Sequence, residues 1–282
     1  MSLPRRPFVP LIAYENPEFF RTMEARPLRI MAEFLDPLVR LRKENVADTI
    51  VIFGSARIAP RERAQRKLEA AQRRLRKKPT PAARDALRAA RAGAQMSRFY
   101  EEARELSRRI TRWALGFGEN PRRFVICSGG GPGIMEAANR GAIEAGGKSM
   151  GLGIRLPHEL APNRYISREL NFYFHYFFMR KLWFAQLAKA LVVFPGGYGT
   201  MDELLEMLTL AQTGKVHPHN LILIYGRRYW DEVIDWRAML RWGTINPREY
   251  ALLQFADNVD EAFERVRTAM EKHHRVPAGE LL

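Results

Sequence analysis

The stretch that decides the fold is LAKALVVFPGGYGTMDELLEMLTLAQTG, residues 187–214. It begins with an apolar run that Pro195 ends, and such a run predicts a strand buried on both faces. A glycine-rich turn follows, and a periodic helix is predicted to open after it, at Thr200. Because glycine has no Cβ, the backbone of this turn can come within hydrogen-bond reach of a ligand. The free N–H groups of a helix start favour an anion, so the stretch predicts a phosphate-binding turn made of Gly196, Gly197, Gly199 and Thr200.

Glu203 lies one turn into this predicted helix and has two interpretations. The spacing Thr200-Met-Asp-Glu203 fits a capping box, in which the glutamate only bonds back to the backbone of Thr200. In the other interpretation, Glu203 is a carboxylate held beside the sugar of a phosphate-anchored ligand. The spacing alone favours the capping box and leaves the functional role open.

A second small turn follows the first predicted strand, residues 49–53. It reads Gly54-Ser55-Ala-Arg57, and its hydroxyl and guanidinium groups can reach a phosphate. An ordinary turn between a strand and a helix, with a surface arginine, is the equally weighted alternative.

A third turn is the richest in glycine and follows the predicted strand 124–127. Its glycines again suit close approach of the backbone to an anion. A dinucleotide site needs an acidic residue at the end of the next strand, but the predicted strand 149–154 is followed by Arg155. The sequence therefore argues against NAD. The glycines of this turn are Gly129, Gly130, Gly131 and Gly133.

Strands and helices alternate along the chain, and almost all of the predicted strands are apolar and buried. This pattern predicts an α/β protein with a Rossmann-like, doubly wound parallel sheet, in which all three turns share the carboxyl edge. We expect an N-terminal helical extension over 1–45, a nucleotide-binding domain over 46–273 and a short tail over 274–282. Helices are predicted, among other places, over 176–190 and 229–242.

A basic insertion over 59–95 interrupts the expected domain. Within 61–95, twelve Lys and Arg residues face three acidic ones, and prolines in the middle predict two helices joined as a hairpin. Charge runs are usually solvated surfaces, and no aromatic residue is interleaved for stacking on bases. The sequence therefore favours a solvated face over nucleic-acid binding for this hairpin.

Composition narrows the protein class further. The chain has 282 residues, a net charge of +15 and a single cysteine, Cys127, which excludes an internal disulfide and favours a reducing compartment. No apolar run approaches a membrane span or a secretory signal. We therefore expect a cytoplasmic location and no membrane partner.

Two clusters of charged or titratable residues remain. Arg180 and Lys181 interrupt an apolar run fifteen residues before the glycine turn. Because buried cations need partners, the two side chains either extend to the surface or face a polar site, and the nearby glycine turn favours the site. The histidine pairs lack carboxylate or cysteine company at a metal-ligand spacing, so no metal is expected there. These pairs are His217 with His219 and His273 with His274.

With these residues in place, the chain resembles the LOG (Lonely Guy) family, often labelled "possible lysine decarboxylase". The PGGxGTxxE motif of that family is matched from Pro195 to Glu203, its Arg-Lys pair by Arg180 and Lys181, and its GGGxxGxM segment by residues 129–135, with Gly133 one place off. The first-strand Gly-Ser is matched by residues 54–55. The resemblance covers about residues 50–273; the first 45 residues and the basic insertion depart from the compact plant-type pattern.

The resemblance implies a cytokinin riboside 5′-monophosphate phosphoribohydrolase or a related protein that cleaves the N-glycosidic bond of a purine nucleotide such as AMP. No cofactor is implied, and no lysine stands in a setting suited to pyridoxal chemistry, so lysine decarboxylation is not expected. The implied catalytic residues are Glu203 and Arg180. The implied substrate-binding residues are Gly54, Ser55, Gly130, Gly131, Lys181, Gly196, Gly197, Gly199 and Thr200.

The family resemblance also implies a homodimer, and an aromatic cluster over 173–184 exceeds what one sheet face can bury. Two rival functions stay open at this point. The same turns can hold a phosphorylated pterin, as in molybdenum-cofactor carriers of this fold, without hydrolysis. Alternatively, the basic insertion makes the chain a nucleic-acid-associated module.

Overall fold

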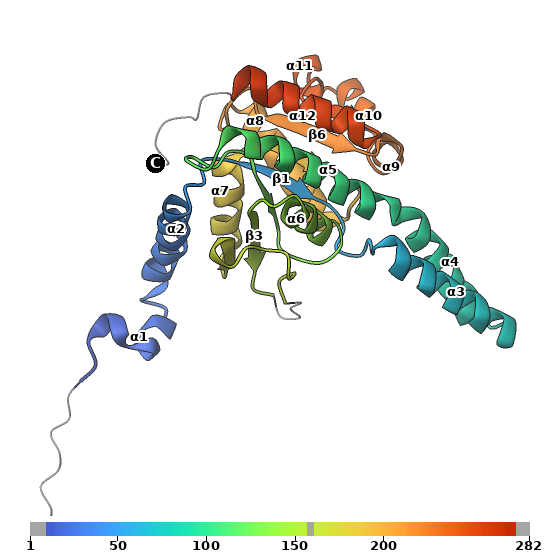
Figure 1. Cartoon of the computed structure of the whole chain (residues 1–282), viewed down its shortest axis with the longest axis horizontal. Helices are drawn as coiled ribbons and strands as arrows, with labels where there is room; N and C mark the ends of the chain where they lie inside the picture. The colour runs from blue at the N-terminus through green and yellow to red at the C-terminus, as the bar shows by residue number, and fades with distance from the viewer. Residues whose placement is uncertain (1–9, 157–160, 275–282) are drawn as a thin grey trace, which may run out of the picture.

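The predicted α/β class is confirmed by a single parallel sheet at the centre of the protein (Figure 1). The computed structural model describes residues 10–156 and 161–274; most of the predicted tail 274–282 and positions 1–9 of the predicted extension lie outside them. The strand order is β4-β3-β2-β1-β5-β6-β7. The strands are β1 Thr49–Phe53, β2 Val125–Ser128, β3 Ser149–Ile154, β4 Asn171–Phe174, β5 Ala188–Val193, β6 Leu221–Tyr225 and β7 Gln254–Ala256.

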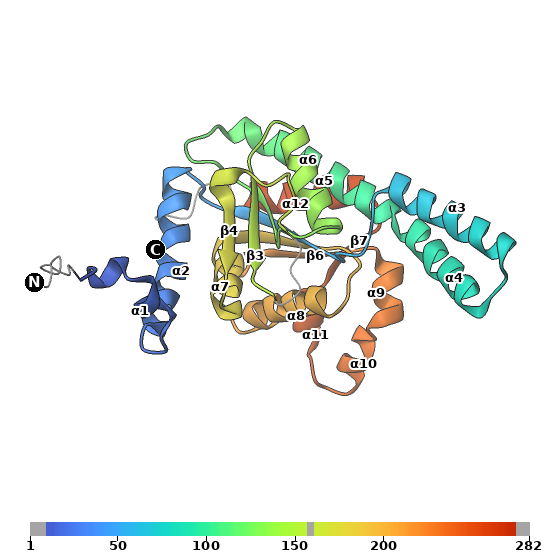
Figure 2. The same ribbon diagram turned by 90° about the horizontal axis from the view of Figure 1, so that it is seen from below.

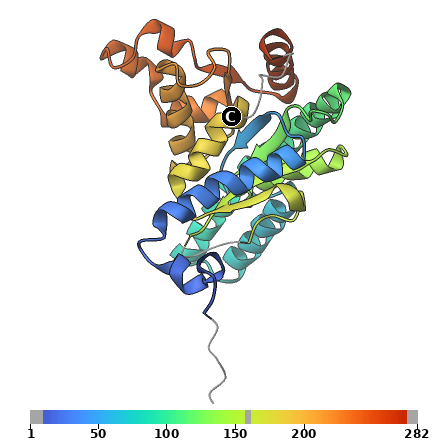
Figure 3. The ribbon, with the colours of Figure 1, turned by 90° about the vertical axis from the view of Figure 1, so that its left-hand side faces the viewer.

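Helices cover both faces of this sheet, which makes it doubly wound (Figure 3). One face packs against α2, α7, α8, α9 and α10, and the other against α5, α6 and α12. The α-helices are α1 Pro17–Arg21, α2 Arg26–Lys43, α3 Arg61–Lys77, α4 Pro81–Met96, α5 Arg98–Ala114, α6 Ile134–Glu144, α7 Phe177–Leu187, α8 Tyr198–Gln212, α9 Arg227–Val233, α10 Trp236–Arg241, α11 Pro247–Tyr250 and α12 Val259–His273. Short 3₁₀ turns are η1 Ala13–Glu15, η2 Leu115–Phe117 and η3 Arg168–Leu170.

The strand order reverses direction between β1 and β5. Strands β2, β3 and β4 extend the sheet on one side of β1, whereas β5, β6 and β7 extend it on the other. Parallel pairing aligns Phe53 with Val193 at the carboxyl ends of β1 and β5. Ligands of open α/β sheets bind in the crevice at such a switch point, so the turns after these two strands lie where the fold favours a site.

The structure corrects two predicted boundaries. The predicted helix 176–190 ends at Leu187, because Ala188 is extended and pairs with Thr49 of β1. The predicted helix 229–242 is two helices, since Ile234 is extended and the side chain of Asp235 accepts a hydrogen bond from the backbone N–H of Ala238 at 2.9 Å. In the first case sheet pairing outweighs the helix propensity of Ala-Lys-Ala; in the second an N-cap residue restarts the helix.

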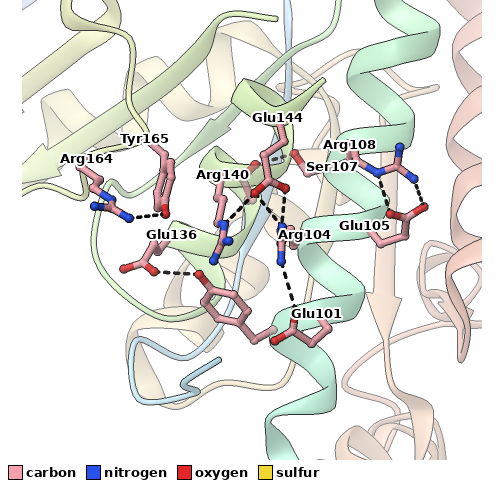
Figure 4. A network of polar contacts seen from close by, with 12 residues as sticks. Glu101, Arg104, Glu105, Ser107, Arg108, Glu136, Arg140, Glu144, Arg164 and Tyr165 are labelled. Carbon is pink, nitrogen blue, oxygen red and sulfur yellow. Dashed lines mark hydrogen bonds and ion pairs between the residues drawn. The ribbon is translucent and has the colours of Figure 1, made fainter. Parts of the chain in front are cut away.

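Helices α5 and α6 pack unusually closely (Figure 4). A Cβ at Gly141 of α6 would lie 2.1 Å from the carbonyl oxygen of Arg104, so only glycine allows this approach. Glu144 links the helices, because it accepts hydrogen bonds from Arg104 Nε at 2.6 Å and from Arg140 Nε at 2.8 Å. This contact fixes the position of α6, which begins directly after the third glycine turn.

No helix in the described ranges has both the length and the apolar character needed to cross a membrane.

Candidate active site

Three turns meet at the carboxyl edge of the sheet, after β1, β2 and β5. Ser55 joins them: its N–H donates to the carbonyl of Pro195 at 3.0 Å, and its carbonyl accepts from the N–H of Ile134 at 3.2 Å. The side chain of Ser55 accepts a hydrogen bond from the N–H of Arg57 at 3.1 Å. The structure therefore brings the three predicted turns into one hydrogen-bonded unit.

Glycine is required at two positions for this unit to form. Gly133 has φ +72°, and a Cβ there would lie 2.3 Å from the carbonyl oxygen of Ser55. A Cβ at Gly196 would lie 2.1 Å from Thr200 Oγ1. Gly54 serves packing in the same way, because a Cβ would meet Ile134 at 2.7 Å. The need for glycine at position 54 is therefore explained by the contact with α6 rather than by the approach of a ligand.

Gly197 and Gly199 differ from these glycines, because a Cβ at either would meet no atom within 4 Å. Both are exposed in the described structure, as is Tyr198 between them. Packing therefore does not require glycine at these positions. The backbone of the turn is open to a molecule approaching from solvent, as a phosphate site needs.

The predicted capping box is wrong. Helix α8 begins at Tyr198 rather than Thr200, its N-cap is Gly197, and no side chain caps it. Thr200 lies inside the helix, where its N–H donates to the carbonyl of Gly197 at 3.0 Å. An uncapped helix start leaves its first N–H groups available to an anion, and Glu203 is released for another role.

Glu203 instead forms a buried ion pair with Arg180 of α7. Arg180 Nη2 donates to Glu203 Oε1 at 3.1 Å, and their side chains are only 12% and 3% exposed respectively. Glu203 lies six residues after Gly197, a rise of about 9 Å along α8. Helical side chains lean toward the N-terminus, so the carboxylate leans toward the glycine turn.

One donor of Arg180 has no partner in the part of the chain that the structure describes. Its Nε is buried and has no hydrogen-bond acceptor among the described residues. Its guanidinium carbon lies 5.2 Å from the ring centre of Phe177 and 5.8 Å from that of Phe184. Burial lowers the pKa of Arg180, opposed chiefly by Glu203. A buried donor without a partner is costly, and an acceptor atom of a bound molecule would satisfy it.

Burial also raises the pKa of Glu203, to about 7. The positive charges of Arg180 and Lys181 oppose this rise, whereas the nearby carboxylates of Glu206 and Asp202 add to it. A carboxyl group with a pKa near neutral exchanges protons readily at physiological pH, which suits acid–base chemistry.

Lys181 is engaged by carboxylates. Its Nζ lies 2.9 Å from both Asp202 Oδ2 and Glu206 Oε2, and 3.9 Å from Glu203 Oε2. Burial tends to lower its pKa, but the hydrogen bonds to Glu206 and Asp202 outweigh burial and raise it. A Schiff-base lysine needs a lowered pKa, so Lys181 is poorly suited to pyridoxal chemistry.

A buried polar network that the sequence reasoning missed supports the turn after β2. Asn163 Nδ2 donates to the carbonyls of Gly130 and Gly131, both at 3.1 Å, and to Asn139 Oδ1 at 2.8 Å. Ser128 Oγ donates to the same Asn139 oxygen at 2.7 Å. Asn139 lies inside α6, although asparagine is a poor helix former. An asparagine within a predicted helix was therefore the one signal in the sequence that could have pointed to this network.

Tyr229 of α9 supports the other main turn. Its hydroxyl donates to the carbonyl of Gly196 at 2.8 Å. The sequence predicts only a helix at Tyr229, and none of its neighbours in sequence signals this contact over 33 residues.

A cavity of about 500 Å³ lies elsewhere: it is lined by residues of α12, of β6 and β7 and of the segments before these strands, including His219 and Thr268. Near it the two histidine pairs come together, with the His219 and His273 rings stacked at 4.0 Å. Within 10–156 and 161–274, no group of three or more His, Cys, Asp or Glu residues is placed to hold a metal ion. None of the three glycine turns lines this cavity. We place the candidate site at the turns, because the switch point of the sheet and the buried Arg180–Glu203 pair lie there.

The switch-point turns and the parallel sheet define the Rossmann-like class of α/β proteins. The family model described as "Possible lysine decarboxylase" matches residues 135–266. The resemblance to the LOG family is thereby confirmed over this segment, which includes Arg180 and the whole motif from Pro195 to Glu203.

Individual relatives agree with this assignment. The chain is 31% identical over 102 residues, 36% of its length and 47% of the relative's, to the probable cytokinin riboside 5′-monophosphate phosphoribohydrolase LOGL3 of Oryza sativa subsp. japonica. It is 29% identical over 98 residues, 34% of its length and 46% of the relative's, to the cytokinin riboside 5′-monophosphate phosphoribohydrolase LOG1 of Arabidopsis thaliana. The matches thus span about half the length of these relatives.

Among solved structures, the chain is similar to a Moco carrier protein from Chlamydomonas reinhardtii. Sequence identity is 22%, the match covers 62% of this chain and 89% of that one, and the TM-score is 0.42.

Proposed function

We propose that this protein hydrolyses the N-glycosidic bond of a purine nucleoside 5′-monophosphate and releases the free base and ribose 5-phosphate. The observation that carries the proposal is the buried pair that Arg180 of α7 forms with Glu203, which lies on the helix that starts at the open glycine turn. The turn suits a phosphate, and the pair suits the sugar and reacting bond.

Each residue then has a separate task. The N–H groups of Gly197, Tyr198 and Gly199 bind the 5′-phosphate, and Arg180 donates its free Nε–H to the phosphate or sugar. Cleavage of the glycosidic bond leaves positive charge on the ribose, as in other glycoside hydrolyses. Ionised Glu203 stabilises that charge and accepts a proton from the water whose oxygen bonds to C1′. The purine leaves as its bond to C1′ breaks and takes up a proton from solvent at nitrogen, and Glu203 then returns its proton to solvent.

Relatives named as cytokinin riboside 5′-monophosphate phosphoribohydrolases support this reaction class. They leave the base undetermined, so we propose a purine nucleotide such as AMP and include cytokinin nucleotides among the substrates to be tested. The contacts of Lys181 with the carboxylates of Asp202 and Glu206 weigh against the lysine decarboxylation named in the family description.

We expect the purified protein to release base from AMP at least about 100-fold more efficiently, in kcat/KM, than from adenosine. Two charge-assisted hydrogen bonds to the phosphate, at roughly 1.5 kcal/mol each, amount to about this factor. Chromatography of released base from AMP, GMP, isopentenyl-AMP and the matching nucleosides measures it.

Equal efficiency on adenosine and AMP would contradict the phosphate-binding role of the turn. Tight binding of the nucleotides without base release, together with binding of a phosphorylated pterin, would instead indicate a carrier of the same fold. These two outcomes separate the substrate part of the proposal from its catalytic part.

We also propose a homodimer, with its contact near α7. Four aromatic residues of the predicted cluster are buried in the core, but Tyr173, Phe177 and Phe178 are 46–50% exposed, and Leu182 is 41% exposed. An exposed apolar patch of this kind marks an interface. Light scattering at micromolar concentration should give twice the monomer mass, and Phe178→Glu should shift the mass toward the monomer. A monomer in the unmodified protein would contradict the proposal.

A further inference from the structure

The basic insertion folds into a helical hairpin that projects from the domain (Figure 1, Figure 2). We call α3, α4 and their connecting turn, residues 61–96, the basic arm. Four buried side chains form its inner seam, and three of them are alanines: Ala64 and Ala71 of α3, and Ala83 and Leu87 of α4. The N–H of Arg61 donates to Glu101 Oε1 at 3.0 Å, which fastens the root of the arm to α5.

The charge of the arm is nearly all uncompensated. Its twelve lysines and arginines are all exposed. Among described residues only Arg73 and Arg88 form an ion pair within 4.0 Å, with Glu69 and Asp85 respectively. By contrast, the neighbouring helix α5 has paired charges: Glu105 Oε1 lies 2.7 Å from Arg108 Nη2 and 2.7 Å from Arg109 Nε. The lack of pairing is therefore a property of the arm, not of the whole surface.

The cations are also arranged in stripes. Arg63 is followed by Arg66 and Lys67, three and four residues later, and Arg84, Arg88 and Arg91 repeat this spacing on α4. Residues so spaced are neighbours on one helix face, where like charges repel and destabilise the helix. The arm keeps this unfavourable arrangement along both helices, and a polyanion laid along the stripes would relieve it.

We infer that the basic arm binds double-stranded nucleic acid through its phosphate backbone, without reading base sequence. A helix of 17 residues, such as α3, is about 25 Å long, and a duplex presents one negative charge per roughly 1.7 Å of its axis over that whole length. Nine of the twelve cations are arginine, whose planar group matches phosphate geometry. The structure thus favours a partner where the sequence pattern alone favoured a solvated face.

Other polyanionic or apolar partners fit the arm less well. Residues 61–96 contain no Phe, Trp or Tyr, so unpaired bases find no stacking platform. The exposed apolar residues of the arm are alanines, apart from Pro79 in the turn and Pro81 at the start of α4. Membrane-surface helices, by contrast, bury large apolar side chains. Protein interfaces likewise rely on aromatic and other large anchors.

The test compares two charge-matched triple variants of the full chain. In the arm variant, Arg63, Arg66 and Arg74 become glutamine; in the control, exposed Arg228, Arg237 and Arg248 of α9, α10 and α11 become glutamine. Fluorescence anisotropy then follows a labelled 20-base-pair duplex, as DNA and as RNA, at several KCl concentrations. Glutamine keeps helix propensity, and circular dichroism checks that both variants fold.

The unmodified protein should bind the duplex with an affinity that falls steeply with salt. The arm variant should lose at least about tenfold in affinity at 100 mM KCl, and the slope of log K against log salt should become shallower by about 2 to 3, since each lost phosphate contact removes about 0.9. The control should stay within about twofold. Replacing 61–92 with a Gly-Ser linker should abolish duplex binding and leave base release from AMP unchanged.

Equal losses in both triple variants would show a non-specific charge effect and overturn the inference. So would stronger binding to anionic vesicles or to single strands than to either duplex, or no duplex binding by a folded protein. The binding assay requires no turnover, so failure of the proposed hydrolase activity leaves this inference intact.

Discussion

Replacing Glu203 with glutamine is expected to lower kcat for base release by about 1,000-fold, within the range of a lost general base. Glutamine keeps the size of the side chain and its hydrogen bond from Arg180, but it cannot carry the negative charge that the ribose cation requires. Base release under saturating AMP, followed by chromatography, measures the loss. Full activity in Glu203→Gln would contradict the catalytic role of this residue.

The pH dependence provides a second readout of the same group. Because the pKa of Glu203 is raised to about 7 and the ionised form is the active one, kcat/KM should rise as pH increases through about 7. Glu206 is among the charges that raise this pKa, and it also holds Lys181. Glu206→Gln should therefore move the acidic limb of the profile to lower pH, and an unchanged limb would assign that limb to another group.

Glutamine rather than alanine is the informative change at this position. Alanine would leave Arg180 buried without its carboxylate, and breaking a buried pair in this way typically costs about 3–5 kcal/mol of stability. In the folded protein Glu203 retains its proton up to about pH 7, whereas in the unfolded chain it loses the proton near its ordinary pKa of 4.5. The contribution of this protonated group to stability is therefore complete below pH 4.5 and is lost as pH rises through 7. Glu203→Gln should therefore flatten the fall of Tm over this window, and a cooperative unfolding transition in the same measurement confirms that the variant is folded.

Replacing Arg180 with alanine is expected to lower kcat/KM for AMP by at least about 100-fold, because a charge-assisted contact to the nucleotide and the orientation of Glu203 are lost together. Arg180 is the largest of the charges that lower the pKa of Glu203. Its removal should therefore shift the acidic limb of the pH profile upward, opposite to the effect of Glu206→Gln.

Arg180→Lys separates these two effects. Lysine restores a positive charge but offers no planar fork and no Nε–H. We expect it to return the acidic limb toward its original position without restoring nucleotide affinity, as measured by KM and by equilibrium binding. Recovery of both would show that charge alone is sufficient at this position.

The fold and the location of the site could be predicted from the sequence because they depend on local patterns. Apolar runs bounded by glycine and proline indicate buried strands, and the order of strand, glycine turn and helix requires a parallel sheet with the turns at one edge. Local competition caused the errors. Ala188 to Ala190 favour a helix by propensity, but pairing with β1 extends them.

The electrostatics of the site could not be predicted, because they depend on contacts between distant residues. The capping-box spacing at Thr200 is genuine, yet the helix starts two residues earlier and Glu203 turns to Arg180, 23 residues away. Likewise, Asn163 reaches Gly130 across 33 residues, and its role follows only from the packed structure. Burial, which sets the pKa of Glu203, is not encoded in its sequence neighbours.

The place where the basic arm enters the chain has a consequence for cleavage of the backbone. The arm is rich in arginine, and its inner seam is mostly alanine, which buries little apolar area per turn, so a protease such as trypsin is expected to cut it first. The arm follows β1 in the chain and is connected at its other end, through α5, to β2. These two strands remain hydrogen-bonded side by side, with Ile50 opposite Ile126. A molecule nicked within the arm should thus remain a two-fragment complex, held together by its own sheet.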